Sequence, residues 1–286
     1  MGVNQDFDND LEIKDDDDIN KIGVKKNMII GTIKIEKNKL RQRLINSYEN
    51  MKFEEWKWMW ENIKAKPNRK EIEKCEIFIN DKRINKNFFN YEYTFPKEGN
   101  YTIKYIFKKP IKSTCFMFCN SESLTSLDFS KFNTKEVTDM GYMFFNCNSL
   151  VSINLSNCKT NNVTNMDSTF FNCSSLVSLD LSSFNTTNVK SMHSMFSRCY
   201  SLISLNLSSF NTKNLTHIGY IFYNCHSLLI LDISNFNLKN IQDGTSLFEC
   251  CYSLISVNLP TRYGKYNIYA NIFKNCSSLI KHSQNF

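Results

Sequence analysis

The sequence is poor in glycine and has no long apolar run, and each absence excludes a class of function. Only 8 of the 286 residues are glycine, and no glycine-rich phosphate loop, H-E-x-x-H or G-x-S-x-G motif occurs. No run approaches the roughly 18 to 20 apolar residues of a membrane-spanning helix. No basic start followed by an apolar core, the mark of a secretory signal, is present. We therefore expect a non-catalytic protein without cofactor, metal or transmembrane segment, and the missing signal favours the cytoplasm.

Charge divides the chain into three parts. Residues 1–26 hold four Lys against eight Asp and Glu, residues 27–112 hold twenty Lys and Arg against eleven acids, and the remainder holds eleven against nine. The first part is acidic and poor in aromatic residues, which predicts a disordered tail. The basic second part is either a solvated surface, which the acidic tail can contact, or a patch for nucleic acid or acidic lipid.

Internal repetition dominates the chain from residue 113. A leucine recurs every 26 residues, with a last spacing of 25: Leu124, Leu150, Leu176, Leu202, Leu228, Leu254 and Leu279. A phenylalanine precedes each of these repeat leucines by six residues, and a cysteine precedes six of them by three. Apolar residues at the third and fifth places after the leucine predict a short strand. Farther along, Val189, Met192, Met195 and Phe196 recur at three- and four-residue spacing, which predicts a short helical segment.

A single 26-residue unit is too small to fold alone, because its few apolar side chains do not offset the entropy lost on ordering. Stacking the units turns their equivalent positions into continuous columns. We therefore predict that Phe144, Phe170 and Phe196 lie above one another in the interior.

The F-x-x-C-x-x-L-x-x-L-x-L pattern resembles the treponemal, BspA-like class of leucine-rich repeats over about 60% of the chain. The resemblance implies an α/β repeat: a leucine-rich-repeat solenoid with a parallel β-sheet on its concave face and short helical segments on its convex face. It also implies attachment, since members of this class are typically surface-displayed or microbial adhesion and interaction proteins. Surface display is therefore the alternative to the cytoplasm as the location of the protein.

Three parts are predicted along the chain: an acidic disordered tail at 1–26, a small β-rich N-terminal capping module at 27–112, and a solenoid of about seven 26-residue repeats at 113–286. Within the module we expect strands at 28–35, 75–80, 88–95 and 101–107, and helix-forming composition over 39–48. An open apolar end of the solenoid needs a cover, which the module would provide.

Cysteine is abundant, with 11 residues, of which six share one column of the repeat. Cysteine at an inward position acts as a small buried hydrophobe, so we expect reduced thiols. Neighbours in the column would lie ~5 Å apart, which leaves disulfides as an alternative. Zinc is disfavoured, because no C-x-x-C occurs and His193, His217, His226 and His282 do not pair with cysteine at ligand spacing.

The second and fourth places after each repeat leucine are expected to point outward. Most of these places hold serine, or aspartate alternating with asparagine. Separation of like charges explains the alternation, and a hydroxyl, amide and carboxylate surface for a partner is the other explanation. The candidate partner-binding residues of this face are Ser126, Asp128, Ser152, Asn154, Ser178, Asp180, Ser204, Asn206, Asp232 and Asn258.

All three tryptophans, Trp56, Trp58 and Trp60, fall on one side of a strand, either in the packed cap or in an exposed binding site. The leading hypothesis is a non-catalytic interaction or adhesion module that binds a protein or peptide, or else a glycan, through the concave face. Nucleic-acid or acidic-membrane binding through the basic, Trp-containing module is the alternative, with nucleic acid less favoured. The sequence does not predict the oligomeric state.

Overall fold

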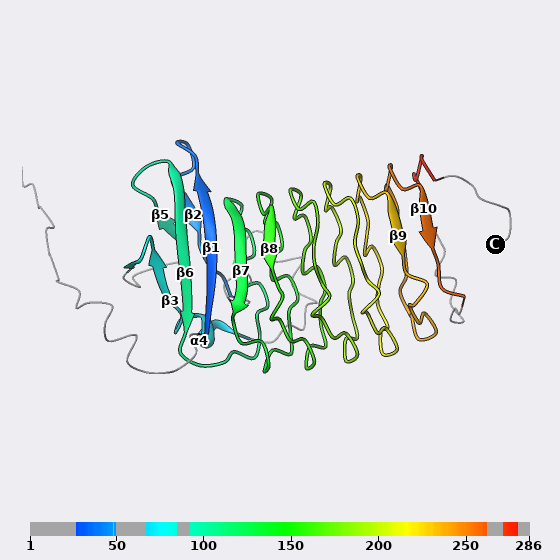
Figure 1. Cartoon of the computed structure of the whole chain (residues 1–286), viewed down its shortest axis with the longest axis horizontal. Coiled ribbons are helices and arrows are strands. Elements are labelled where there is room, and N and C mark those ends of the chain that lie inside the picture. The colour runs from blue at the N-terminus through cyan, green and yellow to red at the C-terminus, as the bar shows by residue number, and fades with distance from the viewer. Residues whose placement is uncertain (1–26, 48, 50–66, 85–91, 262–270, 280–286) are drawn as a thin grey trace, which may run out of the picture.

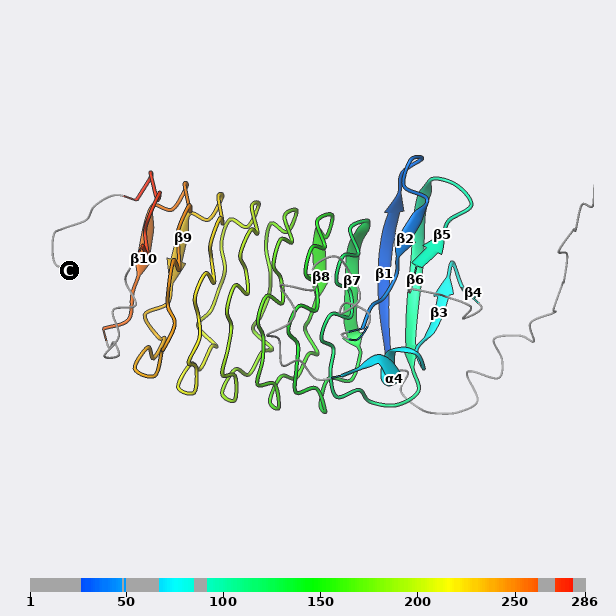
Figure 2. The same cartoon turned by 180° about the vertical axis from the view of Figure 1, so that it is seen from behind.

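The computed structural model describes residues 27–47, 49, 67–84, 92–261 and 271–279. The acidic segment 1–26 and the three tryptophans lie outside these residues, so their predictions stay predictions. The described chain forms a row of similar turns with a β-sheet at its N-terminal end (Figures 1 and 2).

Antiparallel strands build the N-terminal part. Its elements are β1 (Asn27–Ile35), β2 (Arg41–Arg43), α4 (Arg69–Ile72), β3 (Glu76–Ile79), β4 (Lys82–Arg83), β5 (Glu92–Thr94) and β6 (Gly99–Phe107). β1 pairs with β6 along all 9 of its residues. Alternate side chains of β1, at Ile29, Ile33 and Ile35, are buried, as the period of a half-buried strand requires. The helix expected over 39–48 is wrong at 41–43, where β2 pairs with β5.

The sheet continues across the predicted boundary at residue 112. Its strand order is β4-β3-β6-β1-β7-β8, where β7 spans Leu124–Lys131 and β8 spans Ser152–Asn154. β1 runs antiparallel to β7, and β7 runs parallel to β8. Aromatic rings also cross the boundary: Tyr105 contacts Phe118 at 5.2 Å and Phe107 contacts Phe132 at 5.3 Å between centroids. The two parts therefore share one sheet and one core.

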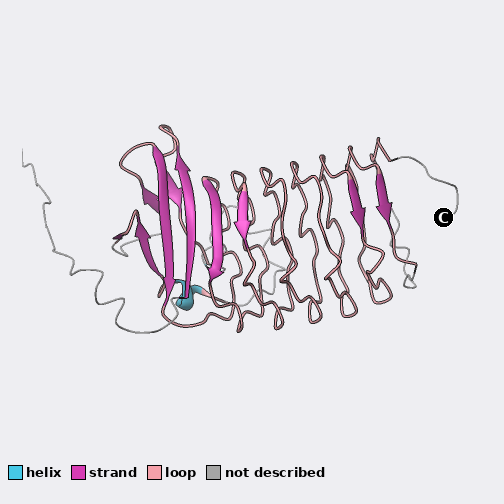
Figure 3. Cartoon of the chain, viewed as in Figure 1, coloured by secondary structure: helices cyan, strands magenta, loops and turns pink. Residues whose placement is uncertain are grey.

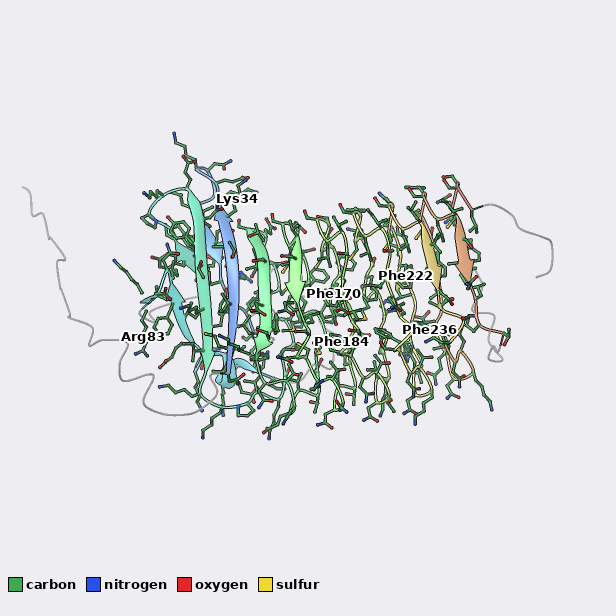
Figure 4. The ribbon with its side chains drawn as sticks, in the orientation of Figure 1. Lys34, Arg83, Phe170, Phe184, Phe222 and Phe236 are labelled. Atoms are coloured by element: carbon green, nitrogen blue, oxygen red, sulfur yellow. The ribbon has the colours of Figure 1, made fainter. Side chains whose placement is uncertain are left out.

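Successive repeats lie directly beside one another. The Phe144 and Phe170 ring centroids are 5.3 Å apart and those of Phe170 and Phe196 are 5.7 Å apart, all three rings being fully buried. The predicted interior phenylalanine column is therefore confirmed. Figure 4 shows Phe170 and Phe222 inside the row of turns, with Phe184 and Phe236 also inside. We call residues 113–279, as far as they are described, the repeat stack.

The predicted α/β leucine-rich-repeat solenoid with short convex helices is wrong. Residues 113–261 contain no helix, and the stack consists of turns, isolated bridges and short strands (Figure 3). Parallel bridges join Ser113, Asp139, Asn165, Ser191, His217 and Asp243 in sequence. On the other side, β7–β8 and β9–β10 form parallel pairs, where β9 is Ile230–Asp232 and β10 is Ser256–Asn258.

Left-handed residues explain why the helical spacing forms no helix. Ser194 and Arg198 have φ of 55° and 61°, and equivalent residues of the other repeats are also positive. The backbone therefore makes consecutive tight turns, in which Met195 N–H bonds within the repeat to Met192 while Phe196 N–H bonds to Ile221 of the next repeat. Apolar residues three or four apart still point inward. An isolated short helix is marginal, so bonds that join neighbouring repeats determine the backbone.

The cysteine column is accounted for by buried thiols. All 11 cysteines are free, and 10 of them are buried. Each column thiol donates to a phenylalanine carbonyl of the preceding repeat, as in Cys173 to Phe144 at 3.2 Å and Cys199 to Phe170 at 3.1 Å. Burial raises the pKa of Cys199 to about 12, so this thiol stays protonated at neutral pH.

Candidate partner-binding surface

One side of the repeat stack exposes the residues predicted to bind a partner. We call the columns at the first, second and fourth places after the repeat leucine the strand face. Residues Ser152, Asn154, Ser178, Asp180, Ser204, Asn206, Asp232 and Asn258 are exposed, and Ser126 and Asp128 are half-buried. The difference comes from β1, which pairs Thr32 with Ser126 and Ile30 with Asp128. β1 therefore borders the strand face at its N-terminal end.

The alternating aspartate and asparagine column has a structural role. Each side chain accepts a hydrogen bond at 2.9 to 3.1 Å from the backbone N–H two residues on, in Asp128, Asn154, Asp180, Asn206 and Asp232. Such local turns suit these two residue types because both carry a short side-chain oxygen. The column therefore shapes the end of each strand whether or not a partner binds.

Amide-to-carboxylate hydrogen bonds join neighbouring repeats at two places. Asn154 donates to Asp128 at 2.9 Å, and Asn258 donates to Asp232 at 3.1 Å. The Ser182 N–H and hydroxyl lower the pKa of Asp180, and Ser234 with Asn258 lowers the pKa of Asp232. Both carboxylates are exposed and ionised at neutral pH. They offer negative charge to a partner that carries basic groups.

Sequence reasoning missed an apolar column on this side. The residue directly after the repeat leucine is aliphatic and 40 to 56% exposed in five repeats: Val151, Val177, Ile203, Leu229 and Ile255. Ile230, 59% exposed, stands where five other repeats have serine and lies between Ser204 and Ser256 in the parallel register. A Leu-Val, Leu-Ile or Leu-Leu pair every 26 residues carried this signal in the sequence. Strand alternation concealed it, because the first place stands at the turn before the strand.

Aromatic rings flank the apolar column in the later repeats. Tyr200 and His226 have centroids 4.7 Å apart, and His226 and Tyr252 are 4.8 Å apart. Tyr252 is exposed, and the other two rings are half-buried. These rings stand two residues before the repeat leucine and three before the exposed aliphatic residue.

The described residues hold no cluster of His, Cys, Asp or Glu that could bind a metal ion. The same residues include no helix long and apolar enough to cross a bilayer.

The fold and this face define a β-rich repeat protein. The family model that matches the chain is described as "Mycoplasma protein of unknown function, DUF285", and it matches residues 51–176, 78–204 and 145–261. These matches together cover more than half of the 286 residues, so the chain belongs to this family. Neither a curated protein nor a solved structure matches the chain.

The predicted membership of the BspA-like leucine-rich-repeat class is wrong. The matching model is that of DUF285, and the convex helices implied by the resemblance are replaced by turns. The F-x-x-C-x-x-L spacing records which side chains fill an interior column, and a stack of turns satisfies it as well as a strand–helix repeat does. Surface display and adhesion were implied by that resemblance alone, so they lose their basis with it.

Proposed function

We propose that this chain is a non-catalytic binding protein whose strand face holds a segment of another protein. The observation that carries the proposal is the exposed aliphatic column of Val151, Val177, Ile203, Leu229 and Ile255. Exposed apolar residues are common singly, whereas an aligned set beside polar columns is typical of an interaction surface. The long row of equivalent repeats provides an extended surface of the kind that repeat proteins use for binding.

The chemistry of the face favours a protein segment over a glycan. Aliphatic side chains gain free energy when they leave water against other apolar groups, at roughly 25 cal/mol per Å² of apolar surface. A sugar offers little such surface. The carboxylates of Asp180 and Asp232 add attraction for lysine or arginine. The partner segment that fits best therefore combines apolar side chains with basic ones.

A phage library of random peptides, selected on the immobilised full chain, tests this proposal. The matched variant carries Ile203→Ser, Leu229→Ser and Ile255→Ser, all at exposed positions. The selected peptides should be rich in apolar and basic residues, and the triple variant should weaken their Kd at least tenfold, which corresponds to ~1.4 kcal/mol. A control with Lys34→Ser, Lys37→Ser and Lys39→Ser, exposed on and after β1, should bind as the unchanged chain does.

Circular dichroism melting of each variant separates lost binding from lost folding. If the selected peptides bound the triple serine variant with unchanged affinity, the assignment of the strand face as the binding surface would be refuted. Binding to oligosaccharides on a glycan array, abolished by the same three substitutions, would assign the face to sugars instead.

Asp180→Asn with Asp232→Asn tests the charge separately. Asparagine keeps the side-chain oxygen that accepts from Ser182 and Ser234 N–H, so the turns remain. Basic peptides should bind this double variant a few-fold more weakly at low salt and equally at high salt. A loss that is independent of salt would contradict the electrostatic role.

A further inference from the structure

Six lysines gather along one edge of the repeat stack. We call Lys131, Lys135, Lys159, Lys190, Lys213 and Lys239 the lysine edge. Lys131 ends β7, and the other five lie between the strand side of their repeat and its parallel bridge residue. All six are exposed, and they are more than half of the 11 Lys and Arg from residue 113 onward. Within the described residues none of them forms an ion pair with a carboxylate. The exposed acidic residue Glu136 directly follows Lys135 in the first turn of this edge.

Side-chain hydrogen bonds hold the turns of this edge in register. The Asn162 amide donates to the Lys135 carbonyl at 2.8 Å, and Asn214 repeats the contact with Thr187 at 2.8 Å. An open groove of about 450 Å³ runs across three repeats, lined by Asn162, Thr164, Asn188, Lys190, Asn214 and Thr216. The lysines are therefore spaced along a fixed surface, with one of them in the groove.

The acidic N-terminal segment joins the structure at this edge. The side-chain oxygen of Asn27, the first described residue, accepts from Asn133 N–H at 2.7 Å, and Met28 pairs with Lys131. β1 then runs away from the edge, opposite to β7 (Figure 1). Figure 4 shows Lys34 at the far end of β1. The preceding residues therefore connect to the chain beside the first turn of the lysine edge.

Charge and length both fit an intramolecular contact. Residues 1–26 contain eight acids against four lysines, and four of the acids are consecutive, Asp15 to Asp18. Eight residues separate Asp18 from Asn27, so the two lie nine positions apart along the chain, which allows a reach of up to ~30 Å. Neighbouring repeats spaced by ~4.8 Å place the fifth turn only ~19 Å from the first. The four consecutive aspartates can therefore reach the groove and the lysines on both sides of it.

We propose that the acidic segment 1–26 binds the lysine edge of its own chain, through the carboxylates of Asp15 to Asp18 and the ammonium groups around Lys190. Tethering raises the local concentration of the segment, so that weak, salt-sensitive ion pairs suffice to keep it there. The bound segment shields the edge from other polyanions. The contact does not involve the strand face, so its test and the test of the proposed function are independent of each other.

Carbodiimide cross-linking of the full chain tests the contact, because it joins carboxylates to lysines that touch. An equal mixture of ¹⁴N- and ¹⁵N-labelled chains is treated at low salt and analysed by peptide mass spectrometry. Cross-links should join Asp15 to Asp18 with Lys159, Lys190 or Lys213 within chains of one isotope, and should fall at least fivefold near 0.5 M salt. Mixed-isotope pairs, cross-links to Lys34 instead, or no cross-link to the edge would overturn the proposal.

Charge-neutral variants show whether the lysines act together. The triple variant Lys159→Gln, Lys190→Gln and Lys213→Gln should form fewer cross-links between the acidic segment and Lys135 or Lys239. Both of these amines are still present in the variant, so the loss would come from weaker binding of the segment. The control Lys34→Gln, Lys37→Gln and Lys39→Gln removes the same charge at the opposite end of β1. It should leave the cross-links to Lys135 and Lys239 unchanged. Equal effects of the two triple variants would indicate only a change in net charge and would refute a specific contact.

A labelled octa-aspartate peptide gives a second readout on the full chain. Changing Asp15 to Asp18 all to asparagine should vacate the edge, so this variant should bind the peptide at least threefold more tightly than the unchanged chain, measured by fluorescence anisotropy. Combining these changes with the glutamine substitutions at the edge should abolish the gain. Equal affinity of the first variant and the unchanged chain would show that the segment does not occupy the edge.

Discussion

The N-terminal sheet and the repeat stack share one core but are held together differently. β1 and β6 pair along nine residues, whereas strands of the stack such as β8 and β9 have three residues each and other links are single bridges. The stack instead relies on columns: rings such as Phe196 against Phe222 at 5.5 Å, and thiols that donate to the neighbouring carbonyl. Long backbone ladders stabilise the first region, and repeated side-chain contacts between nearest neighbours stabilise the second.

Removing one ring from the column should give the largest effect. Phe196 is fully buried between Phe170 and Phe222. Phe196→Ala should lower the free energy of unfolding by ~3 to 5 kcal/mol, through lost burial and the cavity that remains. In hydrogen-exchange mass spectrometry, the repeats on both sides should lose protection while β1 and β6 keep theirs.

Val177→Ala serves as the control, because Val177 is exposed, and it should change stability by less than ~0.5 kcal/mol. If Phe196→Ala left the Tm unchanged, the column would not hold the stack together. If β1 and β6 lost protection together with the repeats, the two regions would unfold as one unit.

The junction of the two regions gives an intermediate effect. An added Cβ at Gly31 would lie 3.1 Å from Leu127 Cδ2, 3.2 Å from Leu124 Cδ1 and 3.3 Å from the Ser126 carbonyl oxygen. Gly31→Val should therefore push β1 from β7 and cost ~1 to 3 kcal/mol. Denaturant unfolding should become less cooperative, with β7 exposed before β6. A single unchanged transition would show that the junction tolerates the extra volume.

The sequence predicted the repeat well because its interior is chemically uniform. The phenylalanine and cysteine positions define columns, and Cys158 is buried where neighbouring repeats have phenylalanine. The backbone between the columns was predicted wrongly, because inward side chains three or four apart fit both a helix and consecutive turns. The positive φ of Ser194 and Arg198 gives consecutive turns in place of a helix, and a positive φ cannot be predicted from serine or arginine as residue types.

The candidate surface was predicted only in part, for a similar reason. Strand alternation located Asp180 and Asp232 on the exposed side, but it concealed Ile203 and Leu229, which stand at the turn before the strand. The lysine edge depends on how turns of different repeats align, which charge sums along the chain do not show. Side-chain bonds such as Asn188 to the Asn161 carbonyl at 2.7 Å set that alignment.

Replacing a half-buried carboxylate within the stack gives the smallest expected effect, and this replacement should stabilise the fold. Asp167 accepts bonds from the Ser191 hydroxyl and from His193 N–H. Burial nevertheless raises its pKa, and nearby Asp139 adds to the rise. The folded chain therefore holds this proton more tightly than the unfolded chain, so this group destabilises the fold as pH rises from about 4 through its raised pKa.

Asp167→Asn keeps an oxygen that can accept both bonds and removes the half-buried charge. The variant should have the higher Tm at pH 7, with a gain within about 1 kcal/mol, and the two chains should melt together near pH 3, where the carboxyl is protonated in both states. Thermal melts at several pH values measure the difference. A variant that is less stable at pH 7 would show that the bonds to the charged carboxylate outweigh its burial, and the nearest-neighbour polar contacts of the stack would then be as important as its rings.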